Sequence, residues 1–295
     1  MRSEGVASEA GSPRDVEPAD PVGAITKRVT AAIPSFIVAV IVIGGWEAAA
    51  RAELVNRLIV PAPTKIFSAF VELFSSGLVW EHLRATVFAT TAGFALGSGA
   101  AFIIGVLCSF WRPFRKVVEP YMITLQVTPR VALAPLFVTW LGFGLSPKIV
   151  MAATICFFPV FVNTLTGLLT TDEEALEMLR SMGATKRQTF TQFTLPSALP
   201  IIFAGLKTAM TLALIGALVA EFVGTSQGLG LLIDRFTFRL AMEESFAVLL
   251  TLALLGLFLY GLMEWLDRRV VYWTHEERLS RREMRSRLRS GRERR

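Results

Sequence analysis

The residues most able to do chemistry are gathered in one polar stretch, 171–200, which lies between two long apolar runs. Glu173 and Glu174 lie on one side of a predicted helix, while apolar residues recur at intervals of three and four on the other side. Thr171 and Asp172 offer N-cap oxygens, and Gly183 suits the left-handed C-cap of the same helix. The pattern predicts a short amphipathic helix that docks into a groove.

The acidic start of this helix indicates what kind of groove it fits. Helices that lie on lipid usually carry lysine and arginine on their polar face, and anionic lipid would repel an acidic one. A groove in another protein is therefore the better partner. The chain has no GxxxxGK[ST] phosphate-binding loop, so any nucleotide chemistry must be on another chain. A second short helix from Thr185 is expected to carry Phe190 and to stop at Pro196.

A second set of candidate residues lies inside the apolar runs and could line a solute path. Arg130 is costly in mid-span unless it is paired, reaches a surface or faces water, and these alternatives stay open. An anionic solute would use Arg130, whereas a neutral heteroaromatic solute would use aromatic side chains. The candidate path residues are Arg130, Phe157, Phe158, Phe161 and Glu221.

The composition requires membrane-spanning helices to position these residues. Of 295 residues, 53% are hydrophobic and only 18% are charged, and the mean hydropathy is +0.53, which is unlike a soluble domain. The net charge of +6 does not indicate nucleic acid, because the basic residues flank the apolar runs, as topology requires. The two cysteines lie in apolar runs and the two histidines are far apart in the sequence. We therefore expect neither a disulfide framework nor a metal site, and no cofactor.

We expect an all-α polytopic membrane protein with about six transmembrane helices. Their predicted ranges are 31–46, 85–110, 119–141, 148–169, 198–223 and 246–265. The loops that this topology places inside are the denser in lysine and arginine, so both termini and the 171–200 loop are expected in the cytoplasm. The domain organisation is then a disordered tail over 1–30, a transmembrane domain over 31–273 and a basic tail over 274–295.

Several finer expectations follow from proline and the small residues. The 119–141 span must kink at Pro129 and Pro135, and the basic segment 111–117 is expected to be a tight turn. Residues 64–74 predict a short amphipathic helix on the outer surface. The glycine-rich segment 224–233 is either a re-entrant, cavity-lining turn or an ordinary loop. Small residues at four-residue spacing within 93–105 favour close helix packing, either inside the bundle or at a subunit interface, and a second stripe of small residues runs along 205–220.

The spacing of the polar stretch resembles the EAA loop of permease subunits of binding-protein-dependent ABC importers. The matching residues are Glu174-Ala175, Gly183-Ala184, Phe190 and Leu195-Pro196. Flanking segments, including the ALAPL run at 132–136 and Ala220-Glu221-Phe222, resemble the branch that serves nitrate, sulfonates, taurine, pyrimidine thiamine precursors and riboflavin-like solutes. The resemblance covers about 33–273.

The resemblance implies a type I ABC importer permease fold with a cytoplasmic coupling helix, in a multi-pass protein of the cell membrane. It also implies cytoplasmic ATP-binding subunits, a second permease copy and an extracytoplasmic solute-binding protein as partners. The resemblance further implies that the permease is not itself an enzyme, because a partner subunit would hydrolyse ATP. The residues implied to couple to the ATPase are Glu174, Ala175, Gly183, Ala184, Phe190, Leu195 and Pro196.

Two other classes of function compete with the importer permease. A membrane scaffold could dock a cytoplasmic regulator through the same helix without transporting anything. A secondary transporter should show internal repeats and ionisable residues near the midplane, and no repeat is evident between the two halves. The arginine-rich 274–295 tail is expected to be a solvated segment that is attracted to anionic membrane lipid.

Overall fold

In the computed structural model, residues 21–56 and 59–273 are described, and all regular structure within these ranges is helical. The chain divides into two compact units, 1–55 and 56–295. The first unit contains helix α1 (Pro21–Arg51). Residues 21–30, which the sequence analysis assigned to the N-terminal tail, belong to α1. A proline is well tolerated at the first helical position, where its missing N–H costs nothing.

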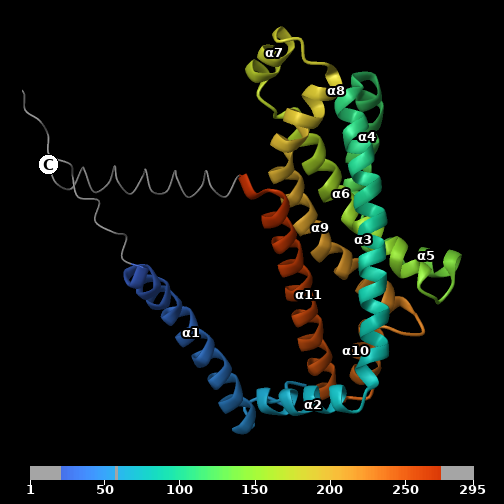
Figure 1. Cartoon of the computed structure of the whole chain (residues 1–295). Helices are drawn as coiled ribbons and strands as arrows, with labels where there is room; N and C mark the ends of the chain where they lie inside the picture. Colours follow the sequence, from blue (N-terminus) through green and yellow to red (C-terminus); the bar gives the residue numbers. More distant parts are fainter. Residues whose placement is uncertain (1–20, 57–58, 274–295) are drawn as a thin grey trace, which may run out of the picture. The chain divides into compact units, whose positions relative to one another are not determined.

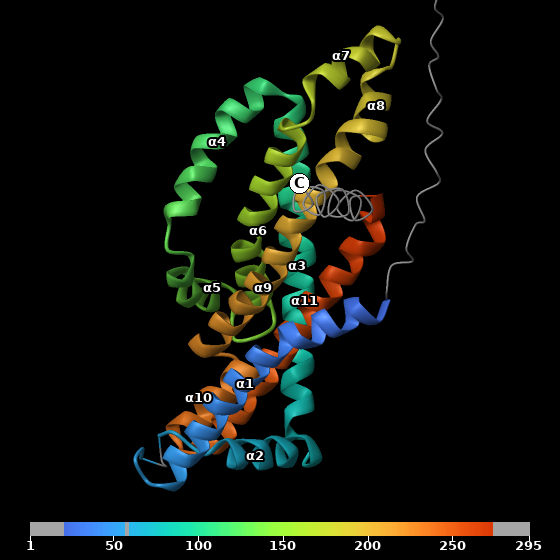
Figure 2. The ribbon, with the colours of Figure 1, turned by 90° about the vertical axis from the view of Figure 1, so that its left-hand side faces the viewer.

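In the second unit, three long helices form the core and a fourth packs beside them (Figures 1 and 2). The core helices are α3 (Leu78–Phe110), α6 (Ser146–Leu169) and α9 (Leu195–Val223), and the fourth is α11 (Met242–Val270). At one end of this bundle lie α7 (Glu173–Ser181) and α8 (Lys186–Thr189). At the other end lie α2 (Pro63–Ser75) and α10 (Leu229–Phe238). Helix α2 confirms the short amphipathic helix that the sequence predicts.

Small residues allow the three core helices to approach closely. A Cβ added at Gly93 of α3 would lie 2.5 Å from Ala152 Cβ, and one at Gly216 of α9 would lie 2.8 Å from Ala152 Cα. Both glycine stripes therefore pack on α6, which confirms packing inside the bundle for these positions. Without a solvent-driven hydrophobic force in lipid, such close van der Waals contact is what holds the helices together.

The predicted kinked span is broken into α4 (Arg112–Val127), a 3₁₀ turn (Arg130–Leu133) and α5 (Ala134–Leu141). The two halves are bent by 85°, with Pro129 in the break and Pro135 in the first turn of α5, so the predicted interruption is confirmed. The expected tight turn over 111–117 is wrong, because α4 begins at Arg112. Pro113 lies in the first helical turn of α4, where no backbone donor is needed.

Among the described residues, four helices are long and apolar enough to cross a membrane, or five if the bent pair forms one span. This is fewer than the expected six. The predicted first span, 31–46, lies inside α1, where several side chains are not described, so that span stays a prediction. Residues 1–20 of the N-terminal tail and the whole 274–295 tail lie outside the described residues.

Candidate functional site

Helix α7 begins at an N-cap that the sequence predicts. Asp172 Oδ1 accepts hydrogen bonds from the backbone N–H groups of Glu174 at 3.0 Å and Ala175 at 3.4 Å. These are two of the donors that a helix leaves without an internal partner. Glu173 and Glu174 occupy the first turn, where the helix dipole stabilises negative charge. The acidic residues therefore stabilise the helix and also give its first turn a negative surface.

The other end of α7 is closed by a Schellman motif around Gly183. The Gly183 N–H donates to Arg180 O, and the Ala184 N–H donates to Leu179 O, both at 3.0 Å. Gly183 has a φ of +83°, and a Cβ built there would meet nothing within 4 Å. Its glycine is thus required by backbone conformation and not by crowding. The result is a short helix that is fixed at both ends.

The segment after α7 differs from the expected short helix. Thr185 and Gln188 form a capping box at the start of α8, and the helix then continues through a π-helical turn over Phe190–Thr194 into α9. Pro196 does not stop the helix. The Leu195 N–H donates to Phe190 O across the wider turn, and this π-bulge re-routes the hydrogen bonds just before the proline in the first turn of α9. The loop after α7 is therefore joined rigidly to a spanning helix.

The sequence-predicted coupling residues divide between an exposed and a packed group. None of the α7 side chains is buried, and Met178 and Met182 are 60% and 76% exposed. Phe190, by contrast, packs on Phe110 of α3 with ring centroids 4.6 Å apart. Leu195 packs beside a small cluster of α6 and α9 residues. Helix α7 thus presents an uncovered face, while the segment that follows it is anchored in the bundle through Phe190 and Leu195.

A cavity of about 330 Å³ lies at the base of α7. Its walls come from α3, α6, α7, α8 and the π-helical turn, and Ala184 and Phe190 are among them. The lining residues are Ser109, Phe110, Leu168, Leu176, Arg180, Ala184, Lys186, Thr189, Phe190 and Thr194. This hollow separates α7 from the bundle on one side, so α7 contacts the rest of the chain mainly through its two ends.

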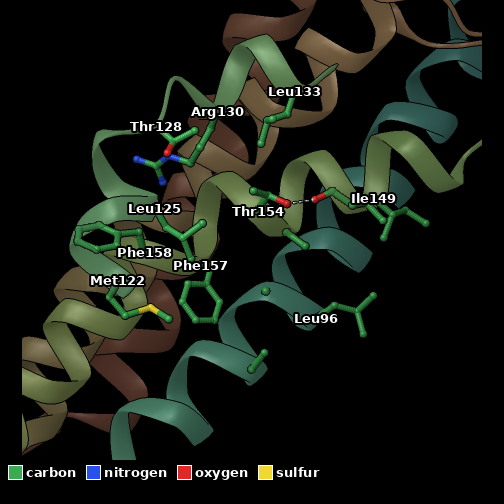
Figure 3. Close-up of a pocket in the computed structure, with 14 residues that line it drawn as sticks. Leu96, Met122, Leu125, Thr128, Arg130, Leu133, Ile149, Thr154, Phe157 and Phe158 are labelled. Carbon is green, nitrogen blue, oxygen red and sulfur yellow. Dashed lines mark hydrogen bonds between the residues drawn. The ribbon is translucent and has the colours of Figure 1, made fainter. Parts of the chain in front are cut away.

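A second cavity, of about 370 Å³, lies between α3, α4, the 3₁₀ turn and α6 (Figure 3). Arg130, Phe157 and Phe158 all line it, as the sequence analysis predicts for a solute path. The Arg130 Nη1 donates to Ile155 O at 3.3 Å, and its guanidinium carbon lies 5.8 Å from the centre of the Phe158 ring. Within the described residues, Arg130 has no carboxylate at salt-bridge distance.

The other two predicted path residues do not line this cavity. Phe161 is buried in the bundle, where its ring stacks on Phe157 at 6.1 Å. Glu221 lies at the α10 end, where it is 1% exposed and 3.5 Å from Lys148 Nζ. The sequence alone could not remove either residue from the candidate path, because a helical pattern does not show which helix covers a given face.

The sequence analysis missed two ion-pair clusters. Lys148, the first residue of the predicted 148–169 span, is buried against Glu221. Lys207 lies inside the predicted 198–223 span, and its Nζ atom lies 2.9 Å from Glu264 and 2.8 Å from Asp267 of α11. Charge balance is the signal that could have found them, since acidic and basic residues within spans must pair or face water.

Comparison with known proteins finds transport permeases among the relatives of this chain. The chain is 34% identical over 236 residues to the formylaminopyrimidine transport permease protein ThiX of Halalkalibacterium halodurans, which covers 79% of this chain and 92% of ThiX. It is 35% identical to the riboflavin transport system permease protein RibX of Chloroflexus aurantiacus, covering 77% and 85%. It is 30% identical to the protein of Bacillus subtilis named "Putative aliphatic sulfonates transport permease protein SsuC", and the match covers 82% of this chain and 86% of SsuC.

The fold resembles a chain of the inward-facing MetNI methionine ABC transporter. The TM-score is 0.57 at 21% identity, and the match covers 66% of this chain and 98% of that one. Residues 93–272 match the family described as the binding-protein-dependent transport system inner membrane component. This range includes the capped helix α7, both cavities and the broken span. The chain therefore belongs to this family and is a multi-pass permease of the binding-protein-dependent ABC importers.

Proposed function

We propose that α7 is the coupling helix of this permease and docks into a cleft of a separate cytoplasmic ATPase. The observation that carries the proposal is that no residue of α7 is buried while both of its ends are fixed. An acidic, apolar-faced helix of this kind fits a protein groove. The α7 end of the bundle and both chain termini then face the cytoplasm, and an extracytoplasmic binding protein delivers solute at the α10 end.

Rigid connections would let α7 transmit movement. It is joined to α6 on one side and, through α8 and the π-helical turn, to α9 on the other. If the ATPase binds α7 differently in its two states, the difference in binding energy displaces α6 and α9 together. A second copy of the permease would complete the transporter, with the translocation path between the broken spans and core helices of the two copies.

We further propose that the cavity at Arg130 belongs to the solute path. A guanidinium without a carboxylate partner can bind an anionic group or a ring carbonyl, and Phe157 and Phe158 can contact a planar ring. The solutes named for the relatives, formylaminopyrimidine, riboflavin and aliphatic sulfonates, each offer one or both of these features. The proposed solute is a pyrimidine thiamine precursor, a riboflavin-like compound, or a small anion such as nitrate, a sulfonate or taurine.

The coupling proposal is tested by purifying the chain together with its ATPase and measuring uptake in liposomes. Copurification and ATP hydrolysis stimulated by solute-loaded binding protein are expected. Gly183→Asp should abolish both coupling and uptake, because it places a negative charge at the helix C-terminus, where the dipole disfavours it. Gly183→Asn has a similar size, also tolerates the left-handed conformation and carries no charge, so it should retain most of each. The coupling-helix assignment would be wrong if Gly183→Asp left assembly and uptake intact.

The same preparation separates the competing classes of function. A docking scaffold would bind a cytoplasmic protein but show no uptake, and a secondary transporter would take up solute without ATP. A ligand screen on the binding protein names the solute. Arg130→Met should then raise the KM for uptake by about tenfold or more if the solute carries a charge, and Arg130→Lys should raise it less. An unchanged KM in both variants would remove Arg130 from the path.

A further inference from the structure

A buried ion pair joins four helices at the α10 end of the bundle. Lys148 is near the start of α6 and Glu221 is near the end of α9, and their side chains are 1% and 0% exposed. The Glu221 Oε1 also accepts from Thr86 Oγ1 of α3 at 2.8 Å. Its Oε2 accepts from the Gly230 N–H in the first turn of α10, also at 2.8 Å. Both oxygens of the buried carboxylate are therefore engaged, and each helix contributes one partner.

The same cluster holds the 224–228 loop that connects α9 to α10. Lys148 Nζ donates to the carbonyl oxygen of Gln227. The next two backbone N–H groups, those of Gly228 and Leu229, donate to His82 Nδ1 and Thr86 Oγ1 of α3, each at 2.9 Å. These bonds satisfy consecutive polar groups of the loop that would otherwise be buried without partners.

Close packing adds to the hydrogen bonds. Gly228 has a φ of +135°, and a Cβ built there would overlap the carboxyl group of Glu221. The loop also reaches the α5–α6 connection, where the Ser226 N–H donates to Phe143 O at 3.3 Å. The loop is thus seated on the ion pair, with no space between its backbone and the carboxylate.

Detaching this loop would be costly. Separating the pair would leave a charge without its partner in a buried site, and the backbone donors of the loop would lose their acceptors at the same time. Segments that open and close during function come from the weakly held parts of a protein. The cluster has the opposite character, and close glycine contacts join α3, α6 and α9 over the rest of their length.

We propose that the 224–228 loop does not act as a gate, and that Lys148 and Glu221 are positioning residues that lock it to α3 and α6. Helices α3, α6, α9 and α10 then move as one rigid body during transport. Access to the path must change by movement between this body and other elements, such as the broken span or the second copy. This inference rests on the proposed importer function.

A reversible crosslink between the loop and α3 tests the proposal directly. The side chains of Gln227 and Glu81 are hydrogen-bonded near the protein surface. In the variant Glu81→Cys/Gln227→Cys, a short, thiol-cleavable bifunctional methanethiosulfonate should bridge the two positions in the assembled transporter. Uptake in liposomes is expected to stay within about twofold of the unbridged variant, since a rigid body need not open there. Each single-cysteine variant, treated with the same reagent, is the control.

The outcomes separate this proposal from the function on which it rests. If bridging reduces uptake about tenfold and a reductant restores it, the loop must detach and the proposal is overturned. If the unmodified transporter shows no ATP-dependent uptake at all, the proposed function fails instead. The native cysteines, Cys108 and Cys156, are buried and so do not compete for the reagent.

A labelling experiment tests the role of the ion pair itself. Thr225 is buried while its neighbour Ser226 is exposed, so a membrane-impermeant maleimide should label Thr225→Cys slowly and Ser226→Cys fast. Adding Lys148→Met or Glu221→Gln should speed labelling of Thr225→Cys about tenfold, and the double change should restore much of the protection, because no unpaired charge remains. ATP-dependent labelling of Thr225→Cys with the pair intact, or equal labelling in all backgrounds, would overturn the proposal.

Discussion

Two glycines of α3, only two positions apart, should respond in opposite ways to the same substitution. A Cβ at Gly97 would lie 2.6 Å from Cys156 Sγ and 2.8 Å from Ala153 Cα of α6, whereas a Cβ at Gly99 would meet nothing within 4 Å. Gly97→Ala should therefore force α3 and α6 apart. Gly99→Ala should only add a residue that favours the helix.

The size of the difference in unfolding free energy can be estimated because both substitutions gain the same helix propensity. Each substitution gains about 1 kcal/mol of helix propensity. Gly97→Ala also overpacks the interface, which typically costs about 1–3 kcal/mol. The upper part of this range is expected, because some of the closest atoms belong to the α6 backbone and cannot give way by side-chain rotation. The difference in unfolding free energy between the two variants is therefore about 2–3 kcal/mol, since the propensity gains cancel.

The assay is apparent thermal stability in detergent, followed by size-exclusion chromatography of heated samples. At about 2–4 °C per kcal/mol for a chain of this size, Gly97→Ala should unfold about 4–12 °C below Gly99→Ala. Gly97 also lines the Arg130 cavity, so its substitution should affect uptake more than that of Gly99. Equal unfolding temperatures for the two variants would refute the close α3–α6 contact on which the reasoning depends.

Three further predictions concern the helix caps and the second ion-pair cluster. Asp172→Ala should cost the α7 N-terminus about 1 kcal/mol and speed hydrogen exchange of the amides that it caps; unchanged exchange would contradict the cap. Gly183→Ala should cost about 1–2 kcal/mol and weaken copurification with the ATPase, and equal retention by Gly183→Ala and Gly183→Asn would argue against the strained conformation. Lys207→Met should lower the unfolding free energy by about 1–3 kcal/mol, because Glu264 and Asp267 lose their shared cation. Lys207→Arg should lower it less, and thermal unfolding of both variants provides the measurement.

Features that depend on neighbouring residues in the chain were predictable. Asp172 and Gly183 cap α7 as expected because a cap is a local hydrogen-bonding pattern within a few residues. The apolar periodicity of α2 and the proline break before α5 are local in the same way. The importer family also follows from local spacing, since the EAA residues lie within a single loop.

Pro196 shows where a local rule was insufficient. A proline removes one backbone donor and crowds the preceding turn, which favours a helix end. Here the π-helical turn over Phe190–Thr194 re-routes the hydrogen bonds and lets the helix continue. The gain from packing Phe190 on Phe110 and Leu195 beside the α6–α9 cluster outweighs the local preference.

The sequence by itself determined that this chain forms membrane helices, where α7 begins and ends, and which family of transporters it belongs to. These features follow from hydropathy, helix caps and motif spacing, which are all properties of contiguous residues. Only the tertiary structure decided that Arg130 shares a cavity with Phe157 and Phe158, and that Glu221 is buried on Lys148 instead. The physical reason is that a charge in a membrane must find a partner or water, and the partner belongs to a helix distant in sequence that only folding brings near.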